Sequence, residues 1–210
     1  MSLSTKRKEG SKGIIVKTQT AFDYDIIYDT DRSYDVIEYA SRAIMDFLRK
    51  IAEDARKAGF NVEIRPDYQN LLLDIRVKDA GKFEDFLNSR IDEYNKLWEK
   101  TLDEIRSYMR SKGITGTVED MSDEWWEMGL TVVNPNSATA MHVRIYQDAD
   151  KRGNYIMGML RKTTVVKPET PINKEKLEQI ADYFIFGNDN TDVHTFKVTE
   201  GPRGIDVTEE

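Results

Sequence analysis

The chain has 210 residues, a length that suits one large domain or a domain with a smaller appendage. Its 38 acidic and 31 basic residues give a net charge of −7, which excludes an overall basic surface for nucleic acid but not a local basic patch. The absence of cysteine excludes disulfides, thiolate metal sites and a cysteine nucleophile. Apolar runs are only a few residues long, so we expect no membrane span and a cytoplasmic protein.

Composition divides the chain into four parts. Residues 1–12 are polar and hold a Lys-Arg-Lys run, which predicts a disordered basic tail. Residues 13–118 have the pattern of a βαββαβ-like α/β sandwich. An antiparallel β-rich portion with short helices is predicted over 119–200 and is expected to pack on the first part. The last residues, 201–210, are predicted to be a polar tail.

Two short strands, at 13–19 and 24–28, precede the first predicted helix. Ser33 is a good N-cap for this helix, and Gly59 suits the left-handed position that follows a helix end. Between them, apolar residues recur at steps of three and four and form one stripe: Ile37, Ala40, Ile44, Phe47, Ile51, Ala55 and Ala58. The sequence therefore predicts an amphipathic helix from about Ser33 to the residue before Gly59.

A β-hairpin follows directly. Residues 60–65 and 71–77 both alternate between apolar and polar side chains, and the segment 66–70 between them has the composition of a turn. This alternation predicts two antiparallel strands with one buried face.

A single long helix is predicted over 79–112, with Asp79 as its N-cap and Gly113 at its end. At about 1.5 Å per residue it would be roughly 50 Å long, more than one sheet usually covers. Its apolar stripe comprises Leu87, Ile91, Tyr94, Trp98, Leu102, Ile105 and Met109. Part of the stripe must pack on something else, which is either the C-terminal half of the chain or a second copy. We take Trp98, Leu102, Ile105 and Met109 as candidate interaction residues.

The order β-α-β-β-α-β over 24–118 is that of a split-βαβ, ferredoxin-like sandwich, and the fold class is therefore α+β. This topology hosts many unrelated functions and implies none. Further elements are predicted as strands at 114–118, 130–133, 139–146, 155–166, 183–186 and 193–198, a helical turn at 122–128, a hairpin turn at 148–154 and a helix at 171–181.

Trp125 and Trp126 stand together in an acidic segment. Neighbouring residues on a helix point about 100° apart, so the two indoles cannot enter the same core, and an exposed tryptophan is favoured as an interface anchor. The simpler interpretation places one indole in the core and the other across the sheet edge. Both residues are candidates for contact with another protein.

The carboxylates of Asp23, Asp25, Asp29 and Asp31 surround the strand at 24–28. Mg²⁺ takes oxygen ligands and often binds one or two carboxylates together with substrate phosphates, so Asp25, Asp29 and Asp31 are candidate ligands of a Mg²⁺-dependent phosphoryl-transfer or nucleic-acid enzyme. Aspartates at such positions also cap helices and form turns for purely local reasons.

Basic residues cluster at two places in the predicted hairpin 144–162, which also carries Tyr146 and Tyr155: they are Lys151, Arg152, Arg161 and Lys162. Basic hairpins with aromatic residues bind single-stranded nucleic acid by stacking and phosphate contacts. Charged hairpin tips are also common as simple solvated surface that discourages aggregation. The hairpin is a candidate nucleic-acid interface.

No catalytic residue is assigned. His142 and His194 lie in different predicted strands, and no nucleophile elbow, zinc-binding helix or phosphate loop is present. We therefore expect no cofactor and a non-enzymatic protein-interaction module that self-associates through the helix 79–112 or the Trp125–Trp126 segment. Its partner is another protein or a second copy. The enzyme and the nucleic-acid-binding module are the alternatives.

Overall fold

The computed structural model describes residues 14–20, 33–123, 125–134, 137–168, 193–201 and 204–209, together with the single positions 173, 175 and 178. Their elements are β1 (Ile14–Thr20), α1 (Ser33–Lys57), β2 (Val62–Asp67), β3 (Leu72–Val77), α2 (Ala80–Ser89), α3 (Ile91–Ser111), β4 (Gly116–Asp120), β5 (Glu127–Asn134), β6 (Ser137–Ala149), β7 (Tyr155–Pro168), β8 (Val193–Gly201) and β9 (Gly204–Glu209). The predicted tail at 1–12, the strands at 24–28 and 183–186, and most of the helix at 171–181 lie outside the described residues.

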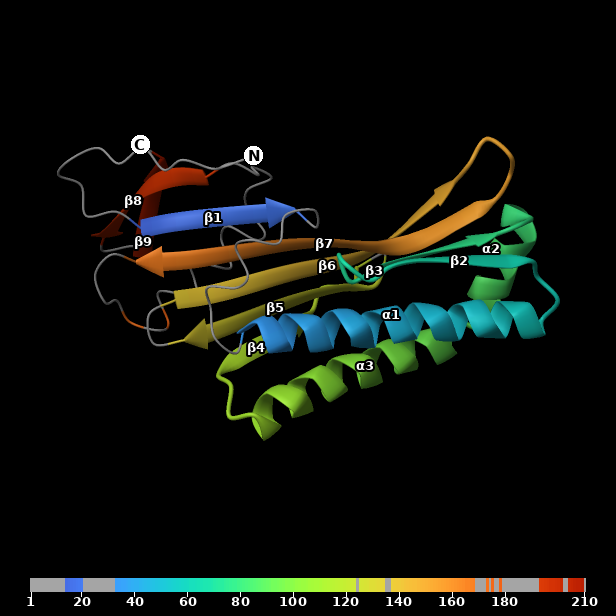
Figure 1. The fold of residues 1–210 in the computed structure, drawn as a ribbon, viewed down its shortest axis with the longest axis horizontal. Helices are drawn as coiled ribbons and strands as arrows, with labels where there is room; N and C mark the ends of the chain where they lie inside the picture. Colours follow the sequence, from blue (N-terminus) through green and yellow to red (C-terminus); the bar gives the residue numbers. More distant parts are fainter. Residues whose placement is uncertain are drawn as a thin grey trace.

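One antiparallel sheet contains all of these strands, and β7 is its centre (Figure 1). Along one edge β7 pairs with β6, which continues to β5 and β4. Along its other edge β7 pairs first with β3 and then with β1, so it joins the β2–β3 hairpin to the β1–β8–β9 group. Strands from both predicted parts of the chain therefore share one sheet, and the α+β class is confirmed.

The ferredoxin-like split-βαβ arrangement is not confirmed. β3 pairs with β2 and β7, both antiparallel, and β4 pairs with β5. Strand β7 lies more than 75 residues after β3 in the chain, and the two strands meet through pairs such as Ile75 with Met157. Because the register of distant strands is set by how their apolar faces meet, local order alone did not define this sheet.

Both α1 and α3 end in the same capping motif. Gly59 has φ 94°, and the backbone N–H groups of Gly59 and Phe60 donate to the carbonyls of Arg56 and Ala55, which completes a Schellman motif. Gly113, with φ 66°, and the residue after it close α3 in the same way. The predicted helix ends at Gly59 and Gly113 are confirmed.

The single helix predicted over 79–112 is wrong, because the chain breaks at Arg90 into α2 and α3. Asp79 caps α2 as predicted, since its side chain accepts a hydrogen bond from the Lys82 N–H. Arg90 has φ −119° and donates its N–H to the carbonyl of Leu87, while the Ser89 hydroxyl donates to a carbonyl of the last turn. Asparagine and serine before the break are weak helix formers, and the break gives each helix its own packing direction.

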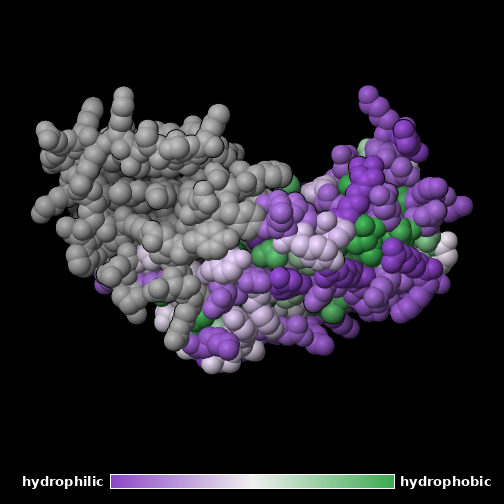
Figure 2. All heavy atoms as spheres, viewed as in Figure 1, coloured by the Kyte–Doolittle hydropathy of each residue, from purple (hydrophilic) through white to green (hydrophobic). Residues whose placement is uncertain are grey.

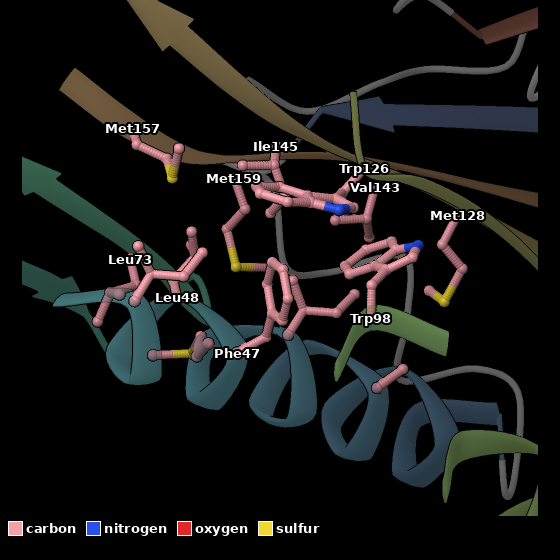
Figure 3. Close-up of a cluster of buried hydrophobic side chains, with 14 of the residues drawn as sticks. Phe47, Leu48, Leu73, Trp98, Trp126, Met128, Val143, Ile145, Met157 and Met159 are labelled. Carbon is pink, nitrogen blue, oxygen red and sulfur yellow. The ribbon is translucent and has the colours of Figure 1, made fainter. Parts of the chain in front are cut away.

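One hydrophobic core lies between the helices and the sheet (Figure 3). Phe47 of α1 meets Trp98 of α3 and Trp126 edge-on, with ring centroids 5.2 and 5.0 Å apart. Strands β3, β5, β6 and β7 complete the core with alternate residues, among them Leu73, Ile75, Met128, Val143, Ile145, Met157 and Met159. Both helices therefore bury their apolar stripes against the same sheet.

Two further sequence predictions differ from the structure. The described residues of 122–128 form no helical turn, because side-chain hydrogen bonds replace the helical ones: the Ser122 hydroxyl accepts from the Glu127 N–H, and Asp120 accepts from the Ser122 N–H. The predicted polar tail at 201–210 contains β9, which pairs with β8. No helix in the described ranges is both long and apolar enough to cross a membrane.

Candidate functional site

The helix residues predicted to form an interaction surface lie in the core instead of on the surface. Trp98, Leu102, Ile105 and Met109 are 1%, 1%, 0% and 3% exposed. Their stripe packs against α1 and β4 of the same chain. A second molecule that approached α3 would therefore meet its opposite, polar face.

The two neighbouring tryptophans have different surroundings. Trp126 is 3% exposed, packs on Phe47, and donates its indole N–H to the side chain of Asn95 at 2.9 Å. Trp125 is half-buried and meets Trp126 edge-on at 6.3 Å. Trp125 is thus the member of the interaction set that keeps accessible indole surface.

The four predicted nucleic-acid-binding cations do not form one patch. Arg161 is buried on the helix side of β7, where it donates to the Ser41 hydroxyl at 3.0 Å. Lys162 is on the opposite face, beside His142 in the register of β6 and β7. Lys151 and Arg152 lie at the β6–β7 turn and are exposed. Only these last two share a site.

The predicted magnesium ligands Asp25, Asp29 and Asp31 lie outside the described residues. Within the described residues, no group of three His, Asp or Glu side chains is arranged to hold a metal ion. His142 lies 3.3 Å from the Glu127 carboxylate, and the side chain of His194 is not described.

A pocket of about 530 Å³ lies between the β2–β3 hairpin and the turn of the β6–β7 hairpin. Five cations and two acids line it: Arg65, Arg76, Lys78, Lys151, Arg152, Glu63 and Asp150. In Figure 2, hydrophilic residues dominate the right-hand end of the molecule, where Figure 1 shows the two hairpins, with smaller apolar spots between them. The pocket lining thus has an excess of three positive charges in a chain whose net charge is −7.

Both acids of this basic pocket are engaged by neighbouring groups. Glu63 accepts from the Arg65 guanidinium at 2.8 Å, and this hydrogen bond lowers the pKa of its carboxyl group. Asp150 accepts from the Asn154 side chain and from the backbone N–H groups of Asn154 and Arg152, which lowers its pKa as well. Both carboxyl groups are therefore ionised at neutral pH.

Three cations of the pocket keep their charge uncompensated. Lys78, Lys151 and Arg152 are exposed, and none forms an ion pair with a residue in the described part of the chain. Arg76 is 3.8 Å from the Asp150 carboxylate, a distance at which the ion pair is weak. The pocket is consequently attractive to an anion that offers several oxygen acceptors.

The β6–β7 turn holds Lys151 and Arg152 in place. Gly153, with φ 78°, donates its N–H to the Asp150 carbonyl, and its own carbonyl accepts from the N–H of Ala80 at the start of α2. The Asp150 carboxylate accepts hydrogen bonds from the backbone N–H groups of Arg152 and Asn154 within the turn. The turn is therefore tied both to itself and to α2, which preorganises the two cations.

Gly158 supports the sheet next to the pocket. In the register it lies between Asp74 of β3 and Tyr146 of β6, and the Tyr146 hydroxyl donates to the Asp74 carboxylate across it at 2.7 Å. Burial and this hydrogen bond raise the pKa of Tyr146. A Cβ atom at Gly158 would overlap both side chains.

The substitution Gly158→Ala is expected to lower the free energy of unfolding by about 1–3 kcal/mol, because it forces Asp74 and Tyr146 apart. Gly81→Ala is the matched control: it has open space around it in α2 and should stabilise the protein by up to about 1 kcal/mol. Urea denaturation followed by circular dichroism measures both. Equal stability of the two variants would contradict the close approach at Gly158.

The sequence pattern missed Arg65, Arg76 and Lys78. Arg65 and Arg76 lie on the polar face of the β2–β3 hairpin, opposite the buried face, and Lys78 follows β3 directly. The signal was the alternation itself, which places Glu63 and Arg65 on one face, but the pairing of β3 with β7 was needed to bring them near the β6–β7 turn.

No known protein family, curated protein or solved structure matches the chain.

Proposed function

We propose that the protein is a nucleic-acid-binding module that holds the phosphate backbone in the basic pocket between its two hairpins. The observation that carries the proposal is the convergence of five cations, from β2, β3, the residue after β3 and the β6–β7 turn, on a pocket of about 530 Å³. Three of them have no counter-charge within the described ranges, so phosphate oxygens would supply the missing acceptors. The chain as a whole is acidic, so this pocket is more attractive to a polyanion than the average surface.

The aromatic residues of the hairpin favour phosphate contacts over base stacking. Tyr155 is buried and packs edge-on against Phe83 at 5.0 Å. Tyr146 is half-buried and donates its hydroxyl to Asp74. Since neither ring lines the pocket, the supported ligand is a polyanion recognised by charge, with little dependence on base sequence.

The double variant Lys151→Ala/Arg152→Ala tests the proposal. Fluorescence anisotropy with labelled single-stranded and duplex oligonucleotides is measured over a series of salt concentrations. We expect weaker binding and a slope of log K against log salt that falls by about 1 for each cation removed, because fewer counterions are released. The matched control is Lys96→Ala/Arg110→Ala, which removes the same charge from exposed positions of α3.

Equal losses in the two double variants would show that only net charge matters, and would contradict a specific role of the pocket. Absence of oligonucleotide binding by the unmodified protein at low salt would contradict the proposed function altogether.

The protein-interaction module and the Mg²⁺-dependent enzyme stay predictions. For self-association through the segment 79–112, the apolar stripe that motivated it is covered by the chain itself, so the contact would have to use polar side chains. Sedimentation velocity tests this prediction. The enzyme depends on Asp25, Asp29 and Asp31, and a divalent-ion titration compared with Asp29→Asn tests it.

A further inference from the structure

All three tryptophans of the chain line a second pocket, which shares no residue with the basic pocket. It lies between the start of α3 and the connection from β4 to β5, and its volume is about 280 Å³. Besides Trp98, Trp125 and Trp126, its lining includes three carboxylates, those of Glu99, Asp120 and Asp123. We call it the tryptophan pocket.

Hydrogen bonds orient two of the three indoles. Trp98 donates its N–H to the Asp120 carboxylate at 3.3 Å, and Trp126 donates to the side chain of Asn95 at 2.9 Å. These two residues line the pocket, and their side chains are almost fully buried. Trp125 is half-buried and stands edge-on to Trp126, with an interplanar angle of 73°. The aromatic lining is therefore held in place before a ligand arrives.

The charge of the tryptophan pocket is negative. None of the described residues that line it is a lysine or an arginine. Glu99 and Asp123 are exposed, and neither has an ion-pair partner among the described residues. Within the described ranges, Asp120 accepts hydrogen bonds from two donors, the Ser122 N–H at 3.1 Å and the indole N–H of Trp98 at 3.3 Å. The described surroundings of these carboxylates thus contain no compensating cation.

From this combination we infer that the tryptophan pocket binds an organic cation, an alkylammonium group with apolar carbons around the charge. Such a group gains from the negative face of the Trp125 indole, the accessible one of the three, and from the carboxylates at the same time. A metal ion requires oxygen ligands that converge on one point, and the indoles offer none. A neutral apolar ligand would desolvate the carboxylates without compensation. The inference is independent of the proposed nucleic-acid binding, which uses the opposite charge at another site.

A titration with choline, followed by the intrinsic fluorescence of the tryptophans, tests the inference. The reference ligand is the uncharged analogue of choline in which a tert-butyl group replaces the trimethylammonium group. Choline is expected to bind about tenfold more tightly than this analogue, since only the charged form has the cation–π and carboxylate interactions. A parallel titration with N-acetyl-lysine amide distinguishes the source of the cation: tighter binding than choline indicates a basic side chain of another protein, and weaker binding a free small molecule.

Two variants locate the binding site, with heteronuclear NMR as the readout because one removes a fluorophore. Trp125→Leu and Asp123→Asn should each weaken choline binding about fivefold or more, and both retain the fold because the positions are not in the core. Asp85→Asn, which removes the same charge from an exposed position of α2, should leave the affinity unchanged. Equal affinity for choline and its neutral analogue, no saturable binding of any probe, or unchanged affinity of Trp125→Leu would each overturn the inference.

Discussion

Replacement of Trp98 by alanine is expected to lower the free energy of unfolding by about 3–5 kcal/mol, the range for deletion of a large aromatic side chain from a core. Trp98 is 1% exposed and is among the largest fully buried side chains of the described residues. Its ring meets the Phe47 ring edge-on, with centroids 5.2 Å apart, and its indole N–H donates a hydrogen bond to the Asp120 carboxylate. The variant loses the contact of Trp98 with Phe47, one of several between α1 and α3, and the remaining cavity cannot collapse while both helices stay on the sheet.

Urea denaturation followed by far-ultraviolet circular dichroism measures this loss, and Lys96→Ala on the exposed face of α3 is the control, with an expected change within about 0.5 kcal/mol. The same pair separates a core role from an interface role. If Trp98 were an interface anchor, its replacement would change the sedimentation coefficient and leave the stability of the monomer nearly unchanged.

The substitution Asp54→Asn is expected to cost about 1–3 kcal/mol of unfolding free energy. Asp54 is only 4% exposed, although it lies on α1. Its carboxylate accepts from Lys50 Nζ at 2.6 Å and from the buried hydroxyl of Tyr94 of α3 at 3.0 Å, and the Arg90 guanidinium is 3.7 Å away. This carboxylate joins α1 to the break between α2 and α3, so its neutralisation loosens the geometry that lets the two helices take different directions.

The contribution of Asp54 should depend on pH in the acid range. Burial raises the pKa of its carboxyl group. The hydrogen bonds from Lys50 and Tyr94 lower this pKa by more than burial raises it, so the pKa in the folded protein is below its ordinary value. A depressed folded-state pKa contributes stability that is complete above the unfolded-state value, near 4, and is lost as the pH falls through the folded-state value.

We therefore expect the difference in unfolding free energy between the unmodified protein and Asp54→Asn to be constant near neutral pH and to shrink below about pH 4. Asp46→Asn is the matched control on the same helix. Its ion pair with Arg49 is on the surface and should contribute less than about 1 kcal/mol. A difference that stays constant down to pH 2 would show that the charge of Asp54 is not involved.

The two pockets show why the net charge of a chain is a poor guide to its ligands. The basic pocket draws its cations from two hairpins, and the tryptophan pocket draws its acids from α3, the end of β4 and the connection from β4 to β5. Charges interact over about 8 Å at physiological salt, so a ligand in either pocket responds to the local lining and much less to the total of −7.

Local sequence signals predicted the elements well where backbone dihedral preferences determine the structure. The glycines at 59 and 113 have the positive φ that ends α1 and α3, and the turn before β3 follows its polar composition, with Asn70 donating to Asp67. The alternation of β2 and β3 matches the buried face that they turn to α1. These features depend on dihedral preferences and on the periods of helix and strand, which neighbouring residues encode.

The sequence by itself thus determined the α+β class, the ends of α1 and α3, the β2–β3 hairpin and most residues of the buried stripes, Ala58 excepted, which is exposed after the end of α1. Only the tertiary structure decided the rest: the break at Arg90, the burial of Arg161, and the meeting of Arg65 and Arg76 with the β6–β7 turn. The physical reason is distance along the chain. Pairing of β3 with β7 brings together residues about 80 positions apart, and it depends on how whole apolar faces fit together, which no short window of sequence contains.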